Sequence, residues 1–528
     1  MISNKMAKFS KSLKCAVLGA ALSVCAGVGW AQDVTLRSPT GMMELSGRFI
    51  AYDGENIQID SVYGPLTLRY AAVICEGDAC PDPVTSVPEL RLSGAARMGR
   101  VLMPALVDGF ARSQGLQVIV DQTDPAHFIQ TLIGPDIGKP VGRFKFRVTN
   151  TDEGFADLIA HEADMVMSVR EVQPSEVALA IEVGLGRLDD AVQSRIVGLD
   201  ALVPVVSPRS MVTTISFEDL SKAFAGGIDN WAALGAVDLP VTLHLGPKAS
   251  GHAQQFVRNV VDAAGRVLST DVVRHADNVT LAAAVAADAG AIGVLPFTDI
   301  GQTQPIALRD ACGFISAPRL TALKTEDYPL TAPMFLYLPS RRLPPLAREF
   351  LAWMRGPQAQ LVVRRAGFVD QGAVPIPLDA QGQRFANAIA AAGDDMPLIE
   401  LQRMVRVLGA RVRLSTSFRF EVGSTRLDAQ SRSNLLSLAQ AIRDGQYNAQ
   451  PLMLVGFSDG RGAAAANRNL SSARATSVLR ELRMLMGGAF PKAVTVETEA
   501  FGEALPMGCD DTEWGRQMNR RVELWVSQ

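Results

Sequence analysis

The sequence predicts a multidomain α/β protein with a small all-β module near its N-terminus. Its 528 residues are enough for three or four domains of roughly 150 residues each. Hydrophobic residues make up 48% and charged residues 20%, which favours filled cores over disorder. From Glu89 to about Asp370, apolar strand-like runs alternate with helical patterns, and this alternation is typical of parallel α/β units.

The first residues have the pattern of an export signal. Four lysines precede an apolar run, Cys15–Ala26, and small residues stand at the positions that a signal peptidase reads before the bond after Ala31. We therefore expect residues 1–31 to be a signal peptide and the remaining chain to be exported. The alternative is a short membrane anchor, although the run is shorter than the roughly 20 residues that a spanning helix needs.

Four cysteines follow residue 31, and an even number in an exported protein favours disulfides. Cys75 and Cys80 bracket a short polar loop that contains a glycine, so a local disulfide is expected between them. Cys312 and Cys509 either pair with each other or remain free. The cysteines and histidines lack the spacing of zinc ligands, and no metal site is expected.

The N-terminal module is expected at residues 33–85. Polar and apolar residues alternate there with period two, and Asp53-Gly54 stands between two such runs as a hairpin turn. A proline-rich linker leads from it into an α/β domain at residues 89–371. Within that domain we expect strands at Gln117–Val120 and Val241–Leu245 and helices at Val101–Ser113 and Ala253–Ala264.

The C-terminal third comprises a second linker with a helix, residues 372–410, and a final domain at residues 411–528. That domain is expected to run strand, helix, strand, helix, strand, loop, strand, with Asp428 capping the first helix and the last strand beginning at Asn519. Its motifs are Phe-x-x-Gly-Ser-x-x-Leu, Ser-Asp-x-x-Gly from Ser458, Asn-x-x-Leu-Ser-x-x-Arg-Ala from Asn467, and Asn-Arg-Arg-Val-Glu. With these motifs the domain resembles the OmpA-like peptidoglycan-binding domain, which has a βαβαββ fold.

The resemblance implies a site for diaminopimelate in the peptidoglycan stem peptide. Asp459 would take its ammonium group and Arg474 its carboxylate, while Asn467, Arg520 and Ser458 would shape the pocket. An acid and a guanidinium that frame one cleft suit such a zwitterion chemically. The alternative is a purely structural Asp–Arg ion pair. The family usually has His-Thr where this chain has Phe457-Ser458.

The central domain contains a series of segments in a characteristic order. They are Leu92–Pro104, Ala163–Arg170, Leu220–Trp231, Ala249–His252, Gly290–Leu295 and Tyr328–Leu330. With these segments it resembles the phosphate-binding family of type II periplasmic solute-binding proteins, which implies a two-lobed fold with a ligand cleft. Such clefts bind oxyanions through backbone N–H groups at helix N-termini.

The resemblance places an anion site at two helix-opening loops and nearby side chains. The candidate residues are Arg97, Thr151, Arg170, Ser250, Gly251 and His252. Several positions depart from the family pattern: Ala95 and Arg97 replace two hydroxyl residues, His252 replaces a threonine, and Lys248 stands near the place of an arginine. The alternative is therefore a clamp that keeps the fold and no longer binds phosphate.

Composition and motifs exclude several other functions. A formal charge of −3 argues against a dedicated nucleic-acid binder. The five histidines form no metalloenzyme motif and Ser250 lies in no nucleophile elbow, so we expect neither an enzyme nor a cofactor.

Two function classes remain. The first is a periplasmic protein, associated with peptidoglycan and the outer membrane, whose clamp presents a small oxyanion. The second is a structural or signalling envelope protein whose clamp binds envelope protein partners or glycan.

Overall fold

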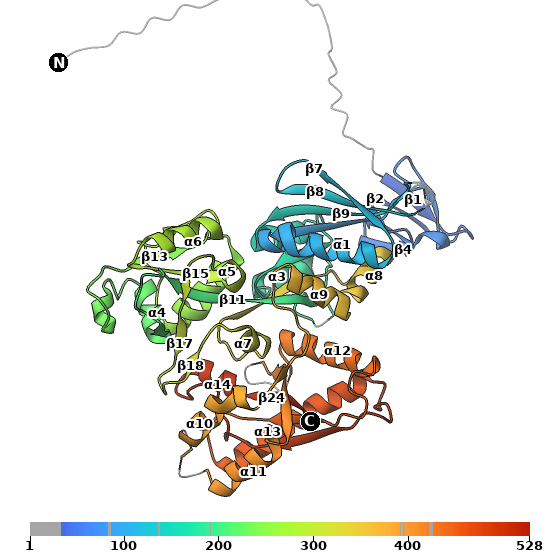
Figure 1. Cartoon of the computed structure of the whole chain (residues 1–528). Coiled ribbons are helices and arrows are strands. Elements are labelled where there is room, and N and C mark those ends of the chain that lie inside the picture. Colours follow the sequence, from blue (N-terminus) through green and yellow to red (C-terminus); the bar gives the residue numbers. More distant parts are fainter. Residues whose placement is uncertain are drawn as a thin grey trace, which may run out of the picture. The chain divides into compact units, whose positions relative to one another are not determined.

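A computed structural model describes residues 33–82, 86–135, 138–190, 192–390, 392–393, 396–421 and 426–527 (Figure 1). The predicted signal peptide lies outside the described residues, as does part of the first OmpA-like motif. The described chain forms two compact units, one made of residues 33–52 and 56–82 and the other containing everything from residue 86 onward. No described helix has both the length and the apolar character needed to cross a membrane.

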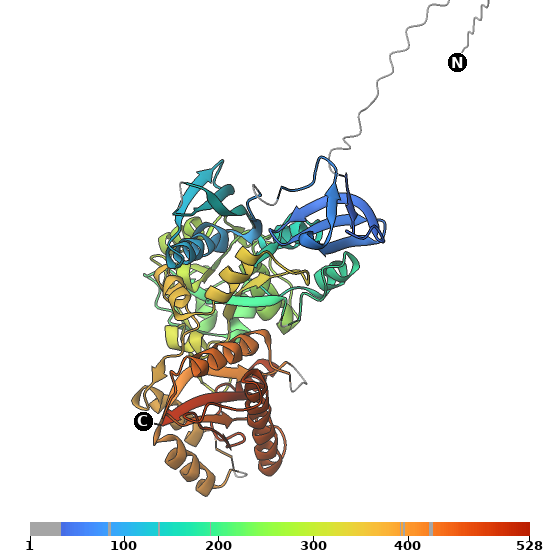
Figure 2. The same cartoon turned by 90° about the vertical axis from the view of Figure 1, so that its right-hand side faces the viewer.

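The N-terminal unit is a five-stranded antiparallel sheet, seen in blue in Figure 2. Its order is β4-β3-β2-β1-β5, with β1 Asp33–Arg37, β2 Glu44–Tyr52, β3 Asn56–Ser61, β4 Gly64–Arg69 and β5 Ile74–Glu76. The predicted hairpin at Asp53-Gly54 is present between β2 and β3, and Gly54 has the positive φ of 88° that this turn requires. The Cys75–Cys80 disulfide is also present.

One mixed sheet runs through the whole central domain, in the order β14-β13-β15-β11-β19-β10-β6-β9-β8-β7. The first lobe consists of β6 Glu89–Ala95, α1 Met103–Ser113, β7 Gln117–Gln122, β8 His127–Ile133, β9 Pro140–Thr149, α2 Thr151–Ile159, β10 Met165–Ser168, α3 Pro174–Glu182, β19 Thr331–Tyr337, α8 Pro345–Trp353 and α9 Pro357–Arg365. Its core is formed by apolar side chains from β6, α1, α8 and α9.

The second lobe is built on the other half of this sheet. It contains β12 Thr214–Ser216, α4 Phe217–Phe224, β13 Thr242–Leu245, α5 Gly251–Phe256, β14 Val273–Arg274, α6 Asn278–Ala287, β15 Ala291–Pro296, β16 Gln304–Pro305, β17 Ala307–Arg309, β18 Ile315–Ser316 and α7 Leu320–Lys324. Strand β11, Ser194–Val206, connects the lobes, because its first half pairs with β19 and its second half with β15. The expected strands and helices of the central domain are thus confirmed, including the helix from Ala253, which α5 opens.

The C-terminal domain has a sheet with the order β20-β21-β24-β22-β23. Its elements are β20 Pro375–Ile376, α10 Gly382–Ala390, α11 Leu398–Leu408, β21 Arg411–Arg419, α12 Ala429–Arg443, β22 Leu452–Gly456, α13 Ala464–Leu485, β23 Val496–Ala500, α14 Glu513–Asn519 and β24 Arg521–Ser527. The predicted strands and helices are present in order, except that the expected loop before the last strand contains the helix α14. Asp428 caps α12 by accepting the N–H of Ser431. The prediction that the last strand begins at Asn519 is wrong, because Asn519 ends α14 and β24 begins at Arg521.

Both faces of this sheet are covered. Alternate residues of β22 point to opposite sides, so Leu452 and Leu454 pack with α12 and α13 while Met453 and Val455 pack with α11. The segment predicted as a linker with a helix therefore supplies α10 and α11 as the second layer, and β20 as an edge strand paired with β21. Figure 1 shows these helices in orange beside the strands.

The central and C-terminal domains are joined by covalent and ionic contacts. Cys312 and Cys509 form a disulfide, which resolves the alternative left open by the sequence. Asp327, which follows α7, accepts two hydrogen bonds from Arg413 of β21, at 2.7 and 3.2 Å. The N–H of Cys509 donates to Asp310 at 2.7 Å.

Candidate functional site

The turn after β22 holds Asp459 in a defined position. Asp459 accepts the N–H of Arg461 at 3.2 Å, and the N–H of Gly460 donates to Asp510 at 2.7 Å. Gly456, the last residue of β22, lies so close to the backbone of Ser471 that a Cβ atom would collide with it. The missing side chain allows α13 to pack directly against the end of the strand, beside the turn that carries Asp459.

Arg474 lies on the face of α13 that is turned inward. The residue is 8% exposed, and within the part of the chain that the structure describes its Nη1 atom has no hydrogen-bond partner. Its guanidinium carbon lies 5.7 Å from the centre of the Phe420 ring. Burial lowers the pKa of Arg474, while the negative charge of Asp459 acts in the opposite direction. The side chain is therefore a buried cation whose Nη1 can still donate a hydrogen bond.

Asp459 is paired with a different arginine, Arg520, at 3.1 Å. Arg520 also forms an ion pair with Glu513 of α14. Ser458 is 2% exposed, and its Oγ atom has no partner among the described residues. The structure thus brings Asp459, Arg474 and Arg520 together beside Ser458, and two buried polar atoms there, Ser458 Oγ and Arg474 Nη1, have no hydrogen-bond partner among the described residues.

Three acidic residues near the site, Glu503, Asp510 and Glu513, were not predicted from the sequence. The side-chain amide of Asn467 donates to Glu503, which sequence reasoning missed. Asp510 and Glu513 were missed as well, because they lie in a segment with no motif. Asn519 accepts the N–H groups of Met507 and Gly508 and donates to Asp510, so the motif asparagine orders the loop that carries these acids.

Phe457, at the position where the family usually has histidine, is a core residue. It is fully buried in the cluster that contains Trp525, and the guanidinium carbon of Arg521 lies 4.4 Å from its ring centre. The phenylalanine is therefore part of the core, and the polar side chain at this point of the chain is that of the neighbouring Ser458.

In the central domain, Arg170 is enclosed by carboxylates. Its side chain is 1% exposed and forms ion pairs with Asp152 and Glu176, each at 2.6 Å. Its Nε donates to Gln254 of α5 at 3.0 Å, and Gln254 also donates to Asp152. Sequence reasoning missed Asp152 and Gln254. Glu176 could have been recognised from the sequence, because it forms the capping box of α3 with Gln173, and this motif is visible in the sequence.

The starts of α2 and α5 touch each other. Thr151, the first residue of α2, is fully buried, and a Cβ atom on Gly251 would lie 2.7 Å from its Oγ1 and 2.7 Å from Val169 Cγ2. The start of α5, which the sequence assigned to an anion, therefore lies directly against Thr151, a further anion-site candidate at the start of α2. An anion between them requires the lobes to separate.

The remaining anion-site candidates have separate environments. Ser250 is the N-cap of α5 and its hydroxyl makes no capping hydrogen bond. Burial lowers the pKa of His252 to about 4, so its ring is neutral at pH 7, and its Nε2 has no described partner. Arg97 forms an ion pair with Asp299 at 3.0 Å and lies over Phe368. The structure brings Thr151, Arg170 and Gly251 together and pairs Arg97 elsewhere.

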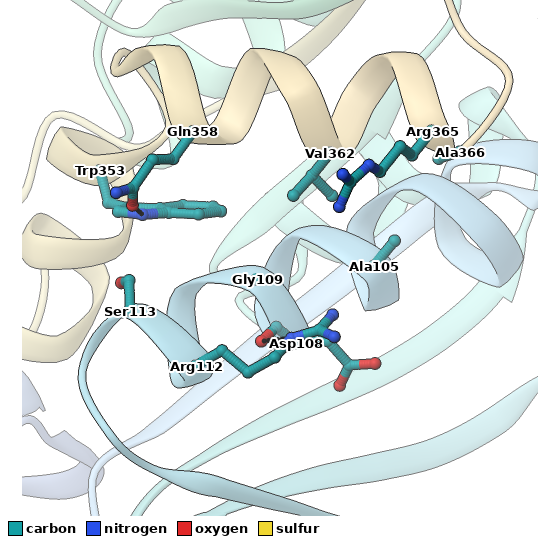
Figure 3. Close-up of a pocket in the computed structure, with 10 residues that line it drawn as sticks. All are labelled: Ala105, Asp108, Gly109, Arg112, Ser113, Trp353, Gln358, Val362, Arg365 and Ala366. Carbon is teal, nitrogen blue, oxygen red and sulfur yellow. Dashed lines mark hydrogen bonds between the residues drawn. The ribbon is translucent and has the colours of Figure 1, made fainter.

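A surface pocket of about 490 Å³ lies between α1 and α9 in the first lobe. Figure 3 shows Trp353 and Val362 on one side of it and Gly109 on the other. None of the residues predicted from the sequence lines this pocket. Among the described residues, Cys312, Cys509 and Asp511 are close enough to hold a metal ion, but both thiols are used by the disulfide.

Comparison with known proteins confirms the two resemblances. Residues 419–520 match the model of the OmpA family, and residues 137–357 match a PBP superfamily domain. The phosphate-binding protein PstS of Bacillus subtilis (strain 168) is 31% identical over 196 residues, which is 37% of this chain and 60% of that protein. Outer membrane porin F of Pseudomonas fluorescens is 31% identical over 115 residues, which is 22% of this chain and 33% of that protein. The chain thus spans less than two thirds of either relative.

Solved structures resemble the same two parts. An ABC-type phosphate transport receptor from Vibrio cholerae aligns with a TM-score of 0.40 and 17% identity over 53% of this chain and 99% of that one. The peptidoglycan-associated lipoprotein from Burkholderia pseudomallei aligns with a TM-score of 0.19 and 25% identity over 21% of this chain and 90% of that one.

Proposed function

We propose that this chain is an exported envelope protein that its C-terminal domain holds non-covalently on peptidoglycan. It would reside in the periplasm, associated with peptidoglycan and the outer membrane, and its ligand would be the diaminopimelate stem peptide. The single observation that supports this most strongly is the buried Arg474 with an unsatisfied Nη1 beside Asp459. An unpaired buried charge is costly, and a ligand carboxylate would remove that cost.

The site has a matching group for each end of the ligand. Arg474 can receive a carboxylate through its free donors, and the Ser458 hydroxyl can add a further hydrogen bond. Asp459 keeps Arg520 as its partner in the free protein, so a ligand ammonium would join or replace that pair. Glu503, Asp510 and Glu513 add negative charge on the side where the ammonium would lie.

For the central domain, the geometry favours the second function class, a structural or signalling element. Two carboxylates already neutralise Arg170, and Asp152 bonds to both Arg170 and Gln254 across the lobes. We propose that Asp152 occupies the role of an internal anion and keeps the cleft closed. Such a clamp would present its outer surface to envelope protein partners and would not take up phosphate.

Hydrogen exchange tests the closed clamp. We expect Asp152→Asn to raise amide exchange in the first turns of α2 and α5 about tenfold, because losing one charge-assisted hydrogen bond costs about 1.4 kcal/mol. Glu153→Gln, an exposed acid on the same turn, is the matched control and should leave exchange unchanged. Millimolar phosphate should not protect these turns in the wild type. If phosphate protected these turns, the closed-clamp proposal would be wrong and the oxyanion-binding function would be favoured instead.

N-terminal sequencing tests export. We expect the protein from the periplasmic fraction to begin at Gln32, because signal peptidase would cleave after Ala31. Recovery of the exported protein with Met1 intact would contradict the signal peptide and favour the short membrane anchor.

A further inference from the structure

A cavity of about 540 Å³ lies where α7, α10 and β21 meet. Its lining is mixed, and its polar residues include Arg319, Thr321, Thr325, Arg384, Asn387 and Arg413. None of the residues assigned to the peptidoglycan site or to the clamp lines it. The cavity therefore needs an explanation of its own.

The wall of this cavity carries more buried positive than negative charge. Arg413 is 2% exposed and Arg384 is largely buried, and behind them Arg419 and Arg521 are also buried. The carboxylates that contact these four guanidinium groups are those of Asp327 and Glu523. Glu523 alone accepts from Arg384, Arg413 and Arg521.

A third nearby acid does not restore the balance. Burial raises the pKa of Glu326 well above its ordinary value, which favours the neutral form, and Arg419 contacts its backbone oxygen instead of its carboxylate. Burial and the neighbouring Arg413 lower the pKa of Arg384. The Nε atoms of Arg413 and Arg419 are buried and have no partner among the described residues. Among the described residues, four guanidinium groups therefore share the two carboxylates of Asp327 and Glu523, and Arg413, whose Nε has no described partner, lines the cavity.

We propose that this cavity binds a small polyanion that carries two or more phosphate or carboxylate groups. Arg384 and Arg413 supply fixed charge at its inner wall, and the exposed Arg319 supplies charge at its mouth. Thr321, Thr325 and Asn387 provide hydrogen-bonding groups between these cations. The volume exceeds what a single phosphate fills, so the site suits an anion with at least two charged groups.

The cavity lies at the junction of the central and C-terminal domains, so a bound ligand affects the contact between them. Asp327 belongs to the central domain and Arg413 to the C-terminal domain, and both line the cavity. A polyanion bound there neutralises the guanidinium groups that meet at the junction. It therefore stabilises the contact between the two domains.

Calorimetric titration of the full mature chain with pyrophosphate and with citrate tests the proposal. We expect at least one of them to bind at micromolar to millimolar concentration, and Arg319→Glu and Asn387→Asp each to weaken it at least tenfold. Arg365→Glu, an exposed arginine in the first lobe with the same charge change, is the control and should bind as the wild type does. Asp152→Asn and Arg474→Met should also leave this binding unchanged, which separates it from the clamp and the peptidoglycan site.

Absence of binding of both probes to the wild type would overturn the proposal. Equal affinity in wild type, Arg319→Glu and Asn387→Asp would overturn it as well. Circular dichroism of each variant shows whether it is folded, and Asn387→Asp preserves side-chain shape, so a loss of affinity in that folded variant reports the added charge.

Discussion

Replacing Arg474 by methionine should weaken binding to isolated sacculi at least thirty-fold while the domain stays folded. The ligand carboxylate would lose its cation in a largely desolvated place, which typically costs about 2–5 kcal/mol, and 1.4 kcal/mol is about tenfold in affinity. Stability should be unchanged or higher, because methionine fills similar space without a buried unpaired charge. Co-sedimentation with sacculi gives the affinity, and thermal unfolding gives the stability.

Two further variants make this result specific. Asp459→Ala should weaken binding by a similar factor, because the ligand ammonium loses its partner. Arg480→Met, an exposed arginine on the same helix, is the matched control and should bind normally. If the Arg474 and Asp459 variants fold and sediment as the wild type does, the pair is structural and the ligand is held elsewhere.

Removing the Cys312–Cys509 disulfide should cost about 2–5 kcal/mol of the free energy of unfolding. The two cysteines are 197 residues apart in the sequence, so the bond closes a long loop in the unfolded chain. Urea unfolding of the Cys312→Ser, Cys509→Ser double variant measures the change. Affinity for sacculi should fall too, because Cys509 adjoins Asp510, which fixes the turn that carries Asp459.

The second disulfide is the internal control. Cys75 and Cys80 are five residues apart, so the Cys75→Ser, Cys80→Ser variant should lose less stability. It should also leave unfolding of the central and C-terminal domains unchanged, because those cysteines belong to the other compact unit. Equal losses of unfolding free energy in both double variants would show that the greater loop length closed by Cys312–Cys509 adds no stability.

Local sequence signals predicted most of the fold. The Asp53-Gly54 turn, the Asp428 cap and the alternation of strands and helices depend on short-range chemistry that one sequence displays. The segment at 372–410 reads as a linker because its prolines are visible, whereas the packing of Leu401 and Met404 against the sheet is a long-range contact. The end of α14 at Asn519 was missed for the same reason, since the asparagine bonds to a loop that precedes it.

The candidate sites show the same difference between local signals, which the sequence displays, and long-range contacts, which it does not. The motifs placed Ser458, Asp459, Arg474 and Arg520 near one another, because they come from adjoining elements. They did not reveal that Asp459 pairs with Arg520, or that Arg474 Nη1 has no hydrogen-bond partner among the described residues. In the clamp, Asp152 and Gln254 are 102 residues apart, and no local pattern connects them. The arginine excess at the domain junction likewise arises from strands and loops that only the folded chain assembles.

The most direct test of the central claim is co-sedimentation of the wild-type mature protein with purified sacculi in the presence of free meso-diaminopimelate. We predict that the protein sediments with sacculi and that diaminopimelate releases it in a concentration-dependent manner, while lysine, which lacks the second carboxylate centre, releases far less. A wild-type protein that remains in the supernatant, or one that diaminopimelate does not release, would contradict the account.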